Sequence, residues 1–477
     1  MNHHQPNNIN DVIEEEEHDV HIDLQEIFAL FDEMFGDLDL NAYEIIELME
    51  DEDWNDLSAI QLMFAGNKRL RKVKFMHERT DWDKHVEMLE YTNNFEHRFR
   101  MKREHFEYLL DAVRDAITVD FARSSNSTGG NEPIYPEMIL AMGLRFCGLG
   151  STVPDLADVY GISDASVRRC ITMFLDAIDY NTTCAELQVK LPDPNDASAL
   201  GELAQRWSNV SDAPGLLEYN LGCIDGWLPR TEMPRNVYNQ TDYFSGHYQC
   251  YGLNVQALTD PDLVFLYVCV AAPGKVNDIR AFNRCTDLLE WLEALPSQYY
   301  IIGDNAYPLS DRVLIPFSGA EFYVPANRTY NYFLCQLRIR IEMAFGRLTT
   351  KWRICRKTLN FANERNSKII SVCTKLHNFC ILMDQRDGGG RIGSFSGNNV
   401  DPREYGIDPL HGVGNQNNPF GYLNTQQTDD DTTVSPGAFV SSLTPDDSRR
   451  TSLVADVVSR RLQQPAYNIE RNADLHG

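Results

Sequence analysis

Leu221-Gly222-Cys223-Ile224-Asp225-Gly226 and, further along the chain, Ile301-Ile302-Gly303-Asp304 share one pattern, a short apolar strand that ends at an aspartate. A carboxylate at the carboxyl end of a buried strand lies at the edge of the sheet, where it can face both solvent and a ligand. Aspartate also begins many loops simply because it forms turns, and this explanation suffices for either residue alone. Two such aspartates in one sheet favour a functional site.

Around these strands, the sequence predicts an α/β domain at residues 216–384. The predicted elements in chain order are strands 221–224, 251–258 and 263–272, helix 278–295, strand 299–302 and helix 335–351. Three strands, a helix, a strand and a helix is the element order of a ribonuclease H-like core.

Glu342 is the one acidic residue in the last of these helices, which is otherwise basic. A basic helix suits a phosphate backbone, so its cationic residues are predicted to bind DNA. These residues are Arg338, Arg340, Arg347, Lys351 and, just beyond the helix, Arg353. The alternative role for Glu342 is an intrahelical salt bridge, because it lies four residues after Arg338.

Asp225, Asp304 and Glu342 are the candidate metal ligands. Carboxylates that converge raise one another's pKa, and a divalent cation relieves that repulsion. Mg²⁺ and Mn²⁺ prefer oxygen ligands, and two such ions can activate water and stabilise the leaving oxygen in phosphodiester cleavage. The sequence therefore predicts a site for two Mg²⁺ or Mn²⁺ ions.

Residues 95–215 are predicted to form an all-α domain with a helix-turn-helix pattern. Gly161 supplies the turn, Ser163 caps the second helix, and Arg168 and Arg169 lie on the polar side of that helix. We expect these two arginines to contact DNA. Ordinary helical hairpins give the same pattern, so that alternative stays open.

The two ends of the chain differ in composition from its middle. Residues 1–60 contain 19 of the acidic residues and no Lys or Arg, so the net charge of −27 leaves only −8 on the remainder. We expect a largely disordered acidic head at 1–65 with an amphipathic helix, a basic linker at 66–94 and a low-complexity tail at 385–477. A short helix is predicted near 453–462. The head either binds a partner or is a solvated appendage.

Several classes of protein are disfavoured by the sequence. The longest apolar run, 264–272, is too short to cross a bilayer, and the N-terminus lacks the features of a secretory signal. Eleven cysteines without a Cys-x-x-Cys pair suit reduced thiols, so we expect an intracellular protein. Cys373, His377 and Cys380 have helical spacing but no evident fourth ligand, so burial explains them better than zinc. Phosphate-binding glycine loops and nucleophile elbows are absent from the sequence.

Ordered blocks between about residues 95 and 385 resemble those of Harbinger-type transposases, which are DDE endonucleases. Any one block is a weak signal, but all of them in this order are specific. The blocks are Phe99-Arg100-Met101, Cys223-Ile224-Asp225-Gly226, Leu253-Asn254-Val255-Gln256-Ala257, Pro273-Gly274-Lys275-Val276-Asn277-Asp278, Gly303-Asp304-Asn305-Ala306-Tyr307-Pro308-Leu309, Ile341-Glu342-Met343-Ala344-Phe345-Gly346 and Leu376-His377-Asn378-Phe379.

The resemblance implies that Asp225, Asp304 and Glu342 are the catalytic triad of a ribonuclease H-like nuclease, with Asp278 as a further acidic ligand or supporting residue. It implies metal-dependent hydrolysis at transposon ends, followed by attack of the freed 3′-hydroxyl on target DNA. It also implies a Myb-like DNA-binding partner protein, a nuclear location that the cytoplasm can share, and assembly as a homo-oligomer.

Two blocks and the stretch before Leu253 depart from the family pattern. That stretch usually contains Arg-Lys-Gly in the family and here reads Gly246-His247-Tyr248-Gln249-Cys250-Tyr251-Gly252. Trp227 and Leu228 follow Asp225-Gly226 where the family usually has Thr-His, and Asn277 stands where the family usually has His. The triad is unaffected by these changes. Together with the long acidic head, they leave open an alternative function, a domesticated DNA-binding or adaptor protein that keeps the transposase fold without cutting.

Overall fold

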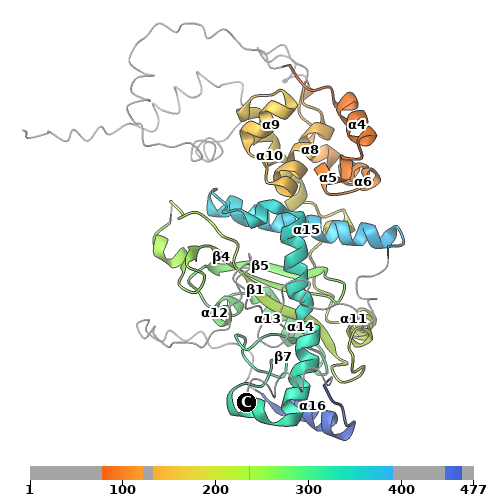
Figure 1. Ribbon diagram of the computed structural model, residues 1–477, viewed down its shortest axis with the longest axis vertical. Helices are drawn as coiled ribbons and strands as arrows, with labels where there is room; N and C mark the ends of the chain where they lie inside the picture. Colours follow the sequence, from red (N-terminus) through yellow and green to blue (C-terminus); the bar gives the residue numbers. More distant parts are fainter. Residues whose placement is uncertain (1–77, 122–132, 236, 390–445, 465–477) are drawn as a thin grey trace, which may run out of the picture. The chain divides into compact units, whose positions relative to one another are not determined.

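A computed structural model describes residues 78–121, 133–235, 237–389 and 446–464 (Figure 1). The chain divides into two compact units, residues 1–70 and 71–477, and all of the described residues belong to the second. The acidic head, and the part of the polar tail at 390–445 and 465–477, therefore lie outside the described residues. Within the described ranges, no helix is long and apolar enough to cross a membrane.

A five-stranded mixed sheet in the order β5-β4-β1-β6-β7 organises residues 220–314 (Figure 1). β1 is antiparallel to β4 and parallel to β6, while β5 pairs antiparallel with β4 and β7 pairs parallel with β6. The strands are β1 Asn220–Trp227, β4 Leu253–Thr259, β5 Phe265–Pro273, β6 Tyr300–Ile302 and β7 Val313–Leu314. The mixed α/β class predicted from the sequence is confirmed.

The sequence pattern did not predict the two-residue strands. A separate hairpin pairs β2 Phe244–Ser245 with β3 Cys250–Tyr251, and the fifth strand of the main sheet, β7, has two residues. Two residues are too few to show the alternation from which strands are recognised. The prediction that Asp225 ends its strand was wrong, because β1 continues to Trp227.

Two predicted helices have different bounds in the structure. The single helix predicted at 278–295 is two, α12 Asp278–Phe282 and α13 Thr286–Ala294. The N–H groups of Arg284 and Cys285 bond to carbonyls three residues back, at 3.0 and 2.9 Å, and such tight turns end an α-helix. The basic helix α14, Pro325–Lys351, begins ten residues earlier than predicted, at a proline suited to a first helical turn.

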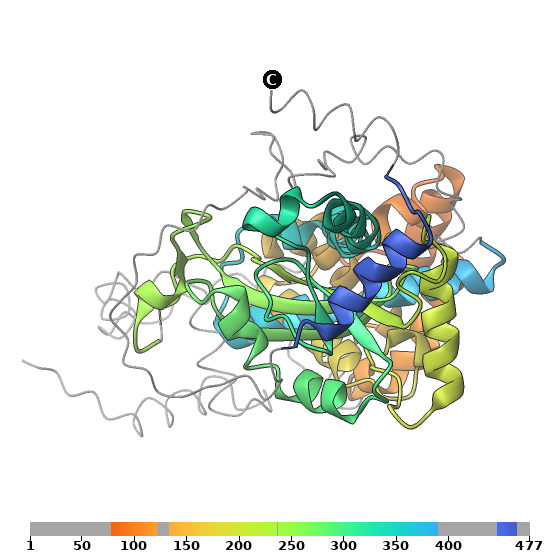
Figure 2. The ribbon, with the colours of Figure 1, turned by 90° about the horizontal axis from the view of Figure 1, so that it is seen from below.

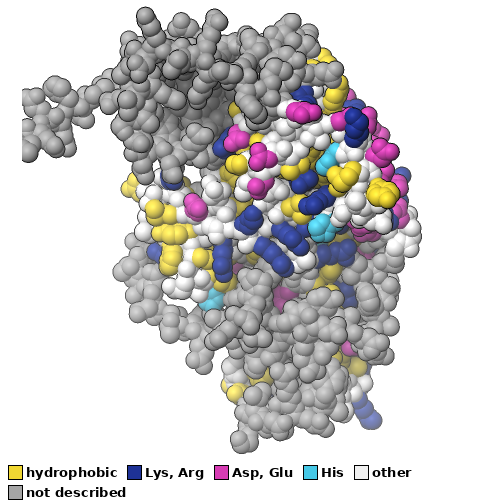
Figure 3. All heavy atoms as spheres, turned by 45° about the horizontal axis from the view of Figure 1, so that its top comes forward, with side chains coloured by type: hydrophobic (Ala, Val, Ile, Leu, Met, Phe, Trp, Pro, Cys, Tyr) yellow, Lys and Arg dark blue, Asp and Glu magenta, His cyan; other side chains and the backbone are white. Residues whose placement is uncertain are grey.

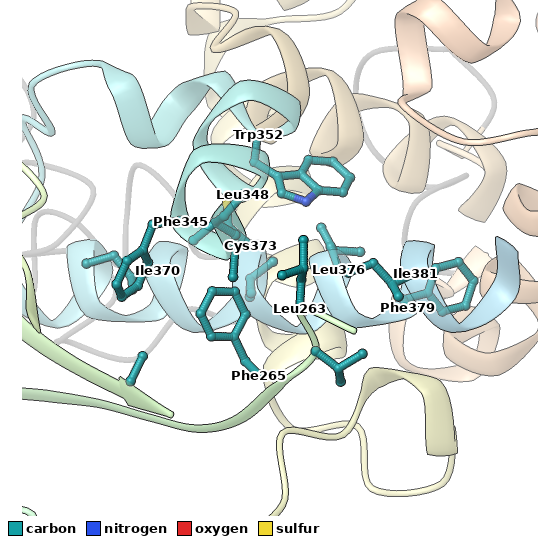
Figure 4. Packing of buried hydrophobic residues seen from close by; sticks show 14 of the residues in the cluster. Leu263, Phe265, Phe345, Leu348, Trp352, Ile370, Cys373, Leu376, Phe379 and Ile381 are labelled. Atoms are coloured by element: carbon teal, nitrogen blue, oxygen red, sulfur yellow. The ribbon is translucent and has the colours of Figure 1, made fainter. Parts of the chain in front are cut away.

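The core between the sheet and the long helices is aromatic and aliphatic. α15, Asn363–Arg386, crosses α14 near the fully buried Trp352 (Figure 4). Phe265 of β5 packs against Phe345 of α14 and His377 of α15, with ring centroids 5.7 and 5.0 Å apart. This packing fixes α14 against the sheet, and α14 carries Glu342.

The N-terminal described segment is helical, as predicted. Its elements are α4 Trp82–Tyr91, α5 Phe95–Phe99, α6 Arg103–Val113, η1 Arg114–Ile117, α8 Pro136–Leu149, α9 Val153–Tyr160, α10 Asp164–Asp179, η2 Ala185–Leu187 and α11 Ala197–Asn209. Gly161 has a φ of +63° between α9 and α10, and the Ser163 hydroxyl accepts from the Ser166 N–H at 3.3 Å. The turn and the cap thus lie where the pattern predicted them.

The remaining elements lie later in the chain. They are η3 Gln240–Tyr243, η4 Gly319–Tyr323, η5 Arg353–Arg356 and α16 Ser448–Ser459. α16 confirms the helix predicted within the polar tail, although it begins five residues earlier. It packs beside α14 (Figure 2).

The contact between α8 and α10 gives a test of this packing. A Cβ at Gly143 would lie 2.0 Å from Cγ of the buried Phe174 ring, so Gly143→Ala should cost about 1–3 kcal/mol of stability through overpacking. Gly201 of α11 is the matched control, because a Cβ there meets nothing within 4 Å. Gly201→Ala should stabilise the helix by about 0.5–1 kcal/mol. Thermal unfolding of both variants checks the packing, and an unchanged melting temperature for Gly143→Ala would contradict it.

Candidate active site

The register of two parallel strands brings Asp225 and Asp304 together. Cys223 of β1 pairs with Ile302 of β6, and each aspartate follows its strand partner by two residues. Asp304 lies just beyond β6, where its Oδ1 accepts from the Ala306 N–H at 2.9 Å. Asp225 is inside β1 and only 8% exposed. Both predicted acids therefore face the same end of the sheet.

Glu342 reaches this end of the sheet from α14, through an arginine. Arg338 Nη1 lies 2.6 Å from Glu342 Oε1 and 3.6 Å from Asp225 Oδ2. The intrahelical salt bridge considered from the four-residue spacing is therefore present, and it extends to the sheet. Glu342 Oε2 is buried and has no hydrogen-bond donor among the described residues.

Asp278, the first residue of α12, completes the group of acids. Its Oδ1 accepts from the side-chain amides of Asn254 and Gln256, both at 3.1 Å. A Cβ on Gly226 would lie only 2.4 Å from the same oxygen, so the absence of a side chain beside Asp225 lets Asp278 approach. Asn277 caps α12 by accepting from the Arg280 N–H at 3.2 Å.

Behind Asp278 lies a hydrogen-bond network that the sequence analysis did not assign. The Tyr307 hydroxyl donates to Gln256 Oε1 at 2.6 Å, and Gln256 Nε2 donates to Asn254 Oδ1 at 2.7 Å. Gln256 and Tyr307 lie in the same sequence blocks as the family resemblance, which was the available signal. The network joins β4, α12 and the loop after β6, and it orients the carboxylate of Asp278.

Burial and like charge dominate the electrostatics of the site. Burial raises the pKa of Asp225 well above its usual range, and the negative charge of Asp304 raises it further. Arg338 opposes this shift, while Glu342 and Asp278 add to it. Burial also raises the pKa of Asp278, against the hydrogen bonds from its two amide partners. Four acids thus share one low-dielectric region with one arginine.

The hairpin β2–β3 contributes a further residue that sequence reasoning missed, Tyr248. Burial raises the pKa of Tyr248, and the charges of Asp278, Asp225 and Asp304 raise it further. Tyr248 therefore lies within electrostatic reach of the acids. Its segment is one in which the chain differs from the family pattern, so the block comparison gave no reason to select it.

The oxygen donors of the site are of the chemical type that a hard divalent cation takes, although they are not spaced closely enough to hold one as they stand. Carboxylate oxygens are the ligands that Mg²⁺ and Mn²⁺ prefer, and Glu342 Oε2 is a buried oxygen whose bonding capacity is unused. Arg338 supplies the positive charge between Asp225 and Glu342. With the acids arranged in this way, no three acidic, histidine or cysteine side chains of the described residues are grouped closely enough to hold a metal ion.

The other predicted DNA-binding residues fall into two groups. Arg340 is half-buried and donates to the Pro261 carbonyl at 2.8 Å, so it supports the turn before β5. Arg353 and Arg169 are exposed, and Arg347, Lys351 and Arg168 are half-buried. Arg347 also lies 3.8 Å from Asp384 of α15.

The structure agrees with burial, rather than zinc binding, as the explanation for Cys373, His377 and Cys380. His377 is buried, its Nε2 lies 2.9 Å from the Leu263 carbonyl oxygen, and burial lowers its pKa to about 3. Cys373 and Cys380 are buried free thiols on the same helix. His377 packs against Phe265 of β5, whereas Cys380 Sγ lies 3.9 Å from the Arg100 carbonyl oxygen on another side of α15.

Comparison with known proteins agrees with this geometry. Residues 224–378 match the model of the DDE superfamily endonucleases, and that span includes all four acids. Over these residues the chain is similar to the DDE superfamily endonucleases. The resemblance predicted from the sequence is thereby confirmed.

Curated relatives extend beyond that span. "Protein ALP1-like" of Arabidopsis thaliana is 25% identical over 307 residues, which cover 61% of this chain and 71% of that protein. "Putative nuclease HARBI1" of Rattus norvegicus is 23% identical over 58% of this chain and 75% of its own length. The Homo sapiens protein of the same name is 23% identical over 54% and 71%, respectively. No solved structure matches the chain significantly.

The network behind Asp278 gives a second prediction. Tyr307→Phe leaves Gln256 Oε1 buried without its donor, which should cost about 1–3 kcal/mol of stability. Tyr330→Phe is the control, because that buried hydroxyl has no partner among the described residues, and its loss should be neutral or stabilising. Thermal unfolding distinguishes the two. Equal melting temperatures for both variants would show that the network does not hold Asp278.

Proposed function

We propose that this chain is a metal-dependent DNA endonuclease of the Harbinger transposase type, with a ribonuclease H-like catalytic core. The observation that carries the proposal is the convergence of Asp225, Asp304, Glu342 and Asp278 from β1, the loop after β6, α14 and α12. Buried carboxylates are costly unless a cation compensates them. The endonuclease match and the relatives with "nuclease" in their names support the proposal.

Asp225, Asp304 and Glu342 would hold the metal, with Asp278 as a further ligand or as support. Two Mg²⁺ or Mn²⁺ ions bound there would activate the attacking oxygen and stabilise the leaving one. Asn254 and Gln256 orient Asp278, and the packing of α14 on the sheet positions Glu342. The protein's own contribution is thus to hold these oxygen donors in place.

The proposed reaction has two displacements at phosphorus. Water first attacks a phosphodiester at the transposon end and displaces the 3′-oxygen, which leaves as a hydroxyl. That 3′-hydroxyl then loses its proton and attacks a phosphodiester of target DNA, displacing another 3′-oxygen. Each step forms one P–O bond and breaks one, so no redox partner is needed.

The proposed DNA surface includes the C-terminal end of α14 and the turn η5. Lys351 lies nine residues after Glu342, roughly 14 Å along the helix axis, and Arg353 follows directly. This distance is a few phosphates along a DNA strand. On the face drawn in Figure 3, Lys and Arg side chains gather near the middle. Arg168 and Arg169 of α10 would form a second contact through the helix-turn-helix-like pair.

Partners and location are part of the same proposal. A Myb-like protein would assist DNA binding, a homo-oligomer would bring two transposon ends together, and the chain would act in the nucleus. The alternative, a domesticated adaptor that keeps the fold without cutting, is favoured by one observation. Arg338 already supplies a cation between Asp225 and Glu342.

Substitution of one acid tests the catalytic proposal. Asp304→Asn keeps an oxygen that can accept from the Ala306 N–H, so folding should be retained, but it removes a charged ligand. Mn²⁺-dependent cleavage of a DNA duplex should fall by roughly 10²- to 10⁴-fold. Asp311→Asn, at a carboxylate 43% exposed, should cleave like wild type. Equal cleavage by wild type and Asp304→Asn would sink the proposal, and absence of cleavage by wild type would favour the adaptor.

Loss of one exposed cation tests the DNA surface. Arg353→Gln should weaken binding of any duplex sequence and reduce the slope of log affinity against log salt concentration by about 1. Lys84→Gln, on the exposed face of α4, should leave the slope unchanged. Fluorescence anisotropy over a range of salt concentrations measures both variants. If Arg353→Gln and wild type have the same slope, DNA does not contact Arg353 and the proposed surface is wrong.

A further inference from the structure

Arg338 is the one cationic group within ion-pair distance of the acids in the described site. Its Nη1 lies 2.6 Å from Glu342 Oε1 and 3.6 Å from Asp225 Oδ2, and its side chain is 15% exposed. It therefore joins the sheet acid to the helix acid. Glu342 Oε1, one of the two oxygens that a metal would use, is occupied by this guanidinium.

The carboxylates need a positive charge whether or not a metal is bound. Asp225 and Glu342 are 8% and 9% exposed, so water screens their repulsion poorly. A buried arginine that pairs with both compensates that charge, and truncation of such a partner is strongly destabilising. The same positive charge repels a divalent cation that approaches the same oxygens.

From this geometry we infer that Arg338 is a resident counter-cation, which stabilises the metal-free site and competes with a divalent ion for Asp225 and Glu342. The inference rests on the proposed function, since it concerns the same oxygens. Metal binding then requires the guanidinium to leave Glu342 Oε1. Arg338 is a positioning residue in this scheme, and it sets the metal concentration at which the site fills.

Arg340 provides a matched control on the same helix. It is half-buried, it donates to the Pro261 carbonyl at 2.8 Å, and no ion pair joins it to the acids of the described site. Removal of either arginine deletes an inward-facing guanidinium from α14. Only removal of Arg338 takes a positive charge from the carboxylates.

The experiment is calorimetric titration of Mn²⁺ into the full chain, with melting temperatures measured with and without Mn²⁺. Arg338→Gln should bind Mn²⁺ at least about tenfold tighter than wild type. Its melting temperature without metal should be lower than that of wild type, and the rise in melting temperature on adding Mn²⁺ should be larger. Arg340→Gln should bind Mn²⁺ like wild type and gain no extra stabilisation. Arg338→Lys, which keeps one positive charge, should stay within about threefold of wild type.

The outcomes separate this inference from the proposed function. If wild type binds Mn²⁺ but Arg338→Gln binds it equally or more weakly, the counter-cation role is wrong and the metal site stands. If neither protein binds Mn²⁺, both proposals fail. If Arg338→Gln does not fold alone, recovery of cooperative melting on adding Mn²⁺ supports the role. Absence of that recovery overturns the counter-cation role. The role is also overturned if Arg338→Lys binds Mn²⁺ as tightly as Arg338→Gln does.

Discussion

The ion pair from Arg338 to Glu342 and Asp225 is the interaction on which the rest of the site depends. It joins α14 to the middle strand of the sheet at distances of 2.6 and 3.6 Å. Without it, acids from two elements would face one another in a region that water hardly enters. A buried, unpaired carboxylate is costly, so α14 can pack on β1 only if the charges of Asp225 and Glu342 are compensated.

The other acids are held by different means. Asp304 is bound to its own loop through the Ala306 N–H, whereas Asp278 is held by the amides of Asn254 and Gln256. Amide donors compensate a carboxylate without adding a full charge. Asp278 therefore keeps its place beside Gly226 independently of Arg338. The site therefore contains one pair of acids joined by an arginine and one acid held by amide donors.

The candidate acids and the fold class could be predicted from the sequence because their signals are local. These signals are apolar strands followed by an aspartate and a single Glu in a basic helix. They gave the salt-bridge alternative for Glu342 as well. They could not show that Arg338 and Arg340 face inward, since both lie in one basic run and only tertiary packing distinguishes them. The hydrogen bond between Gln256 and Tyr307 could not be predicted, because it depends on the register of β4 against β1 and on the path of the loop after β6. The break between α12 and α13 and the two-residue strand β7 have no periodic signal.

We propose that these acids form a divalent cation site from which Arg338 must withdraw. Anomalous diffraction at the manganese edge, from crystals of the full chain grown with Mn²⁺, tests it most directly. We expect an anomalous peak within bonding distance of Asp225, Asp304 and Glu342, with the Arg338 guanidinium moved away from Glu342. A peak elsewhere, or no peak while Arg338 stays paired with Glu342, would contradict it.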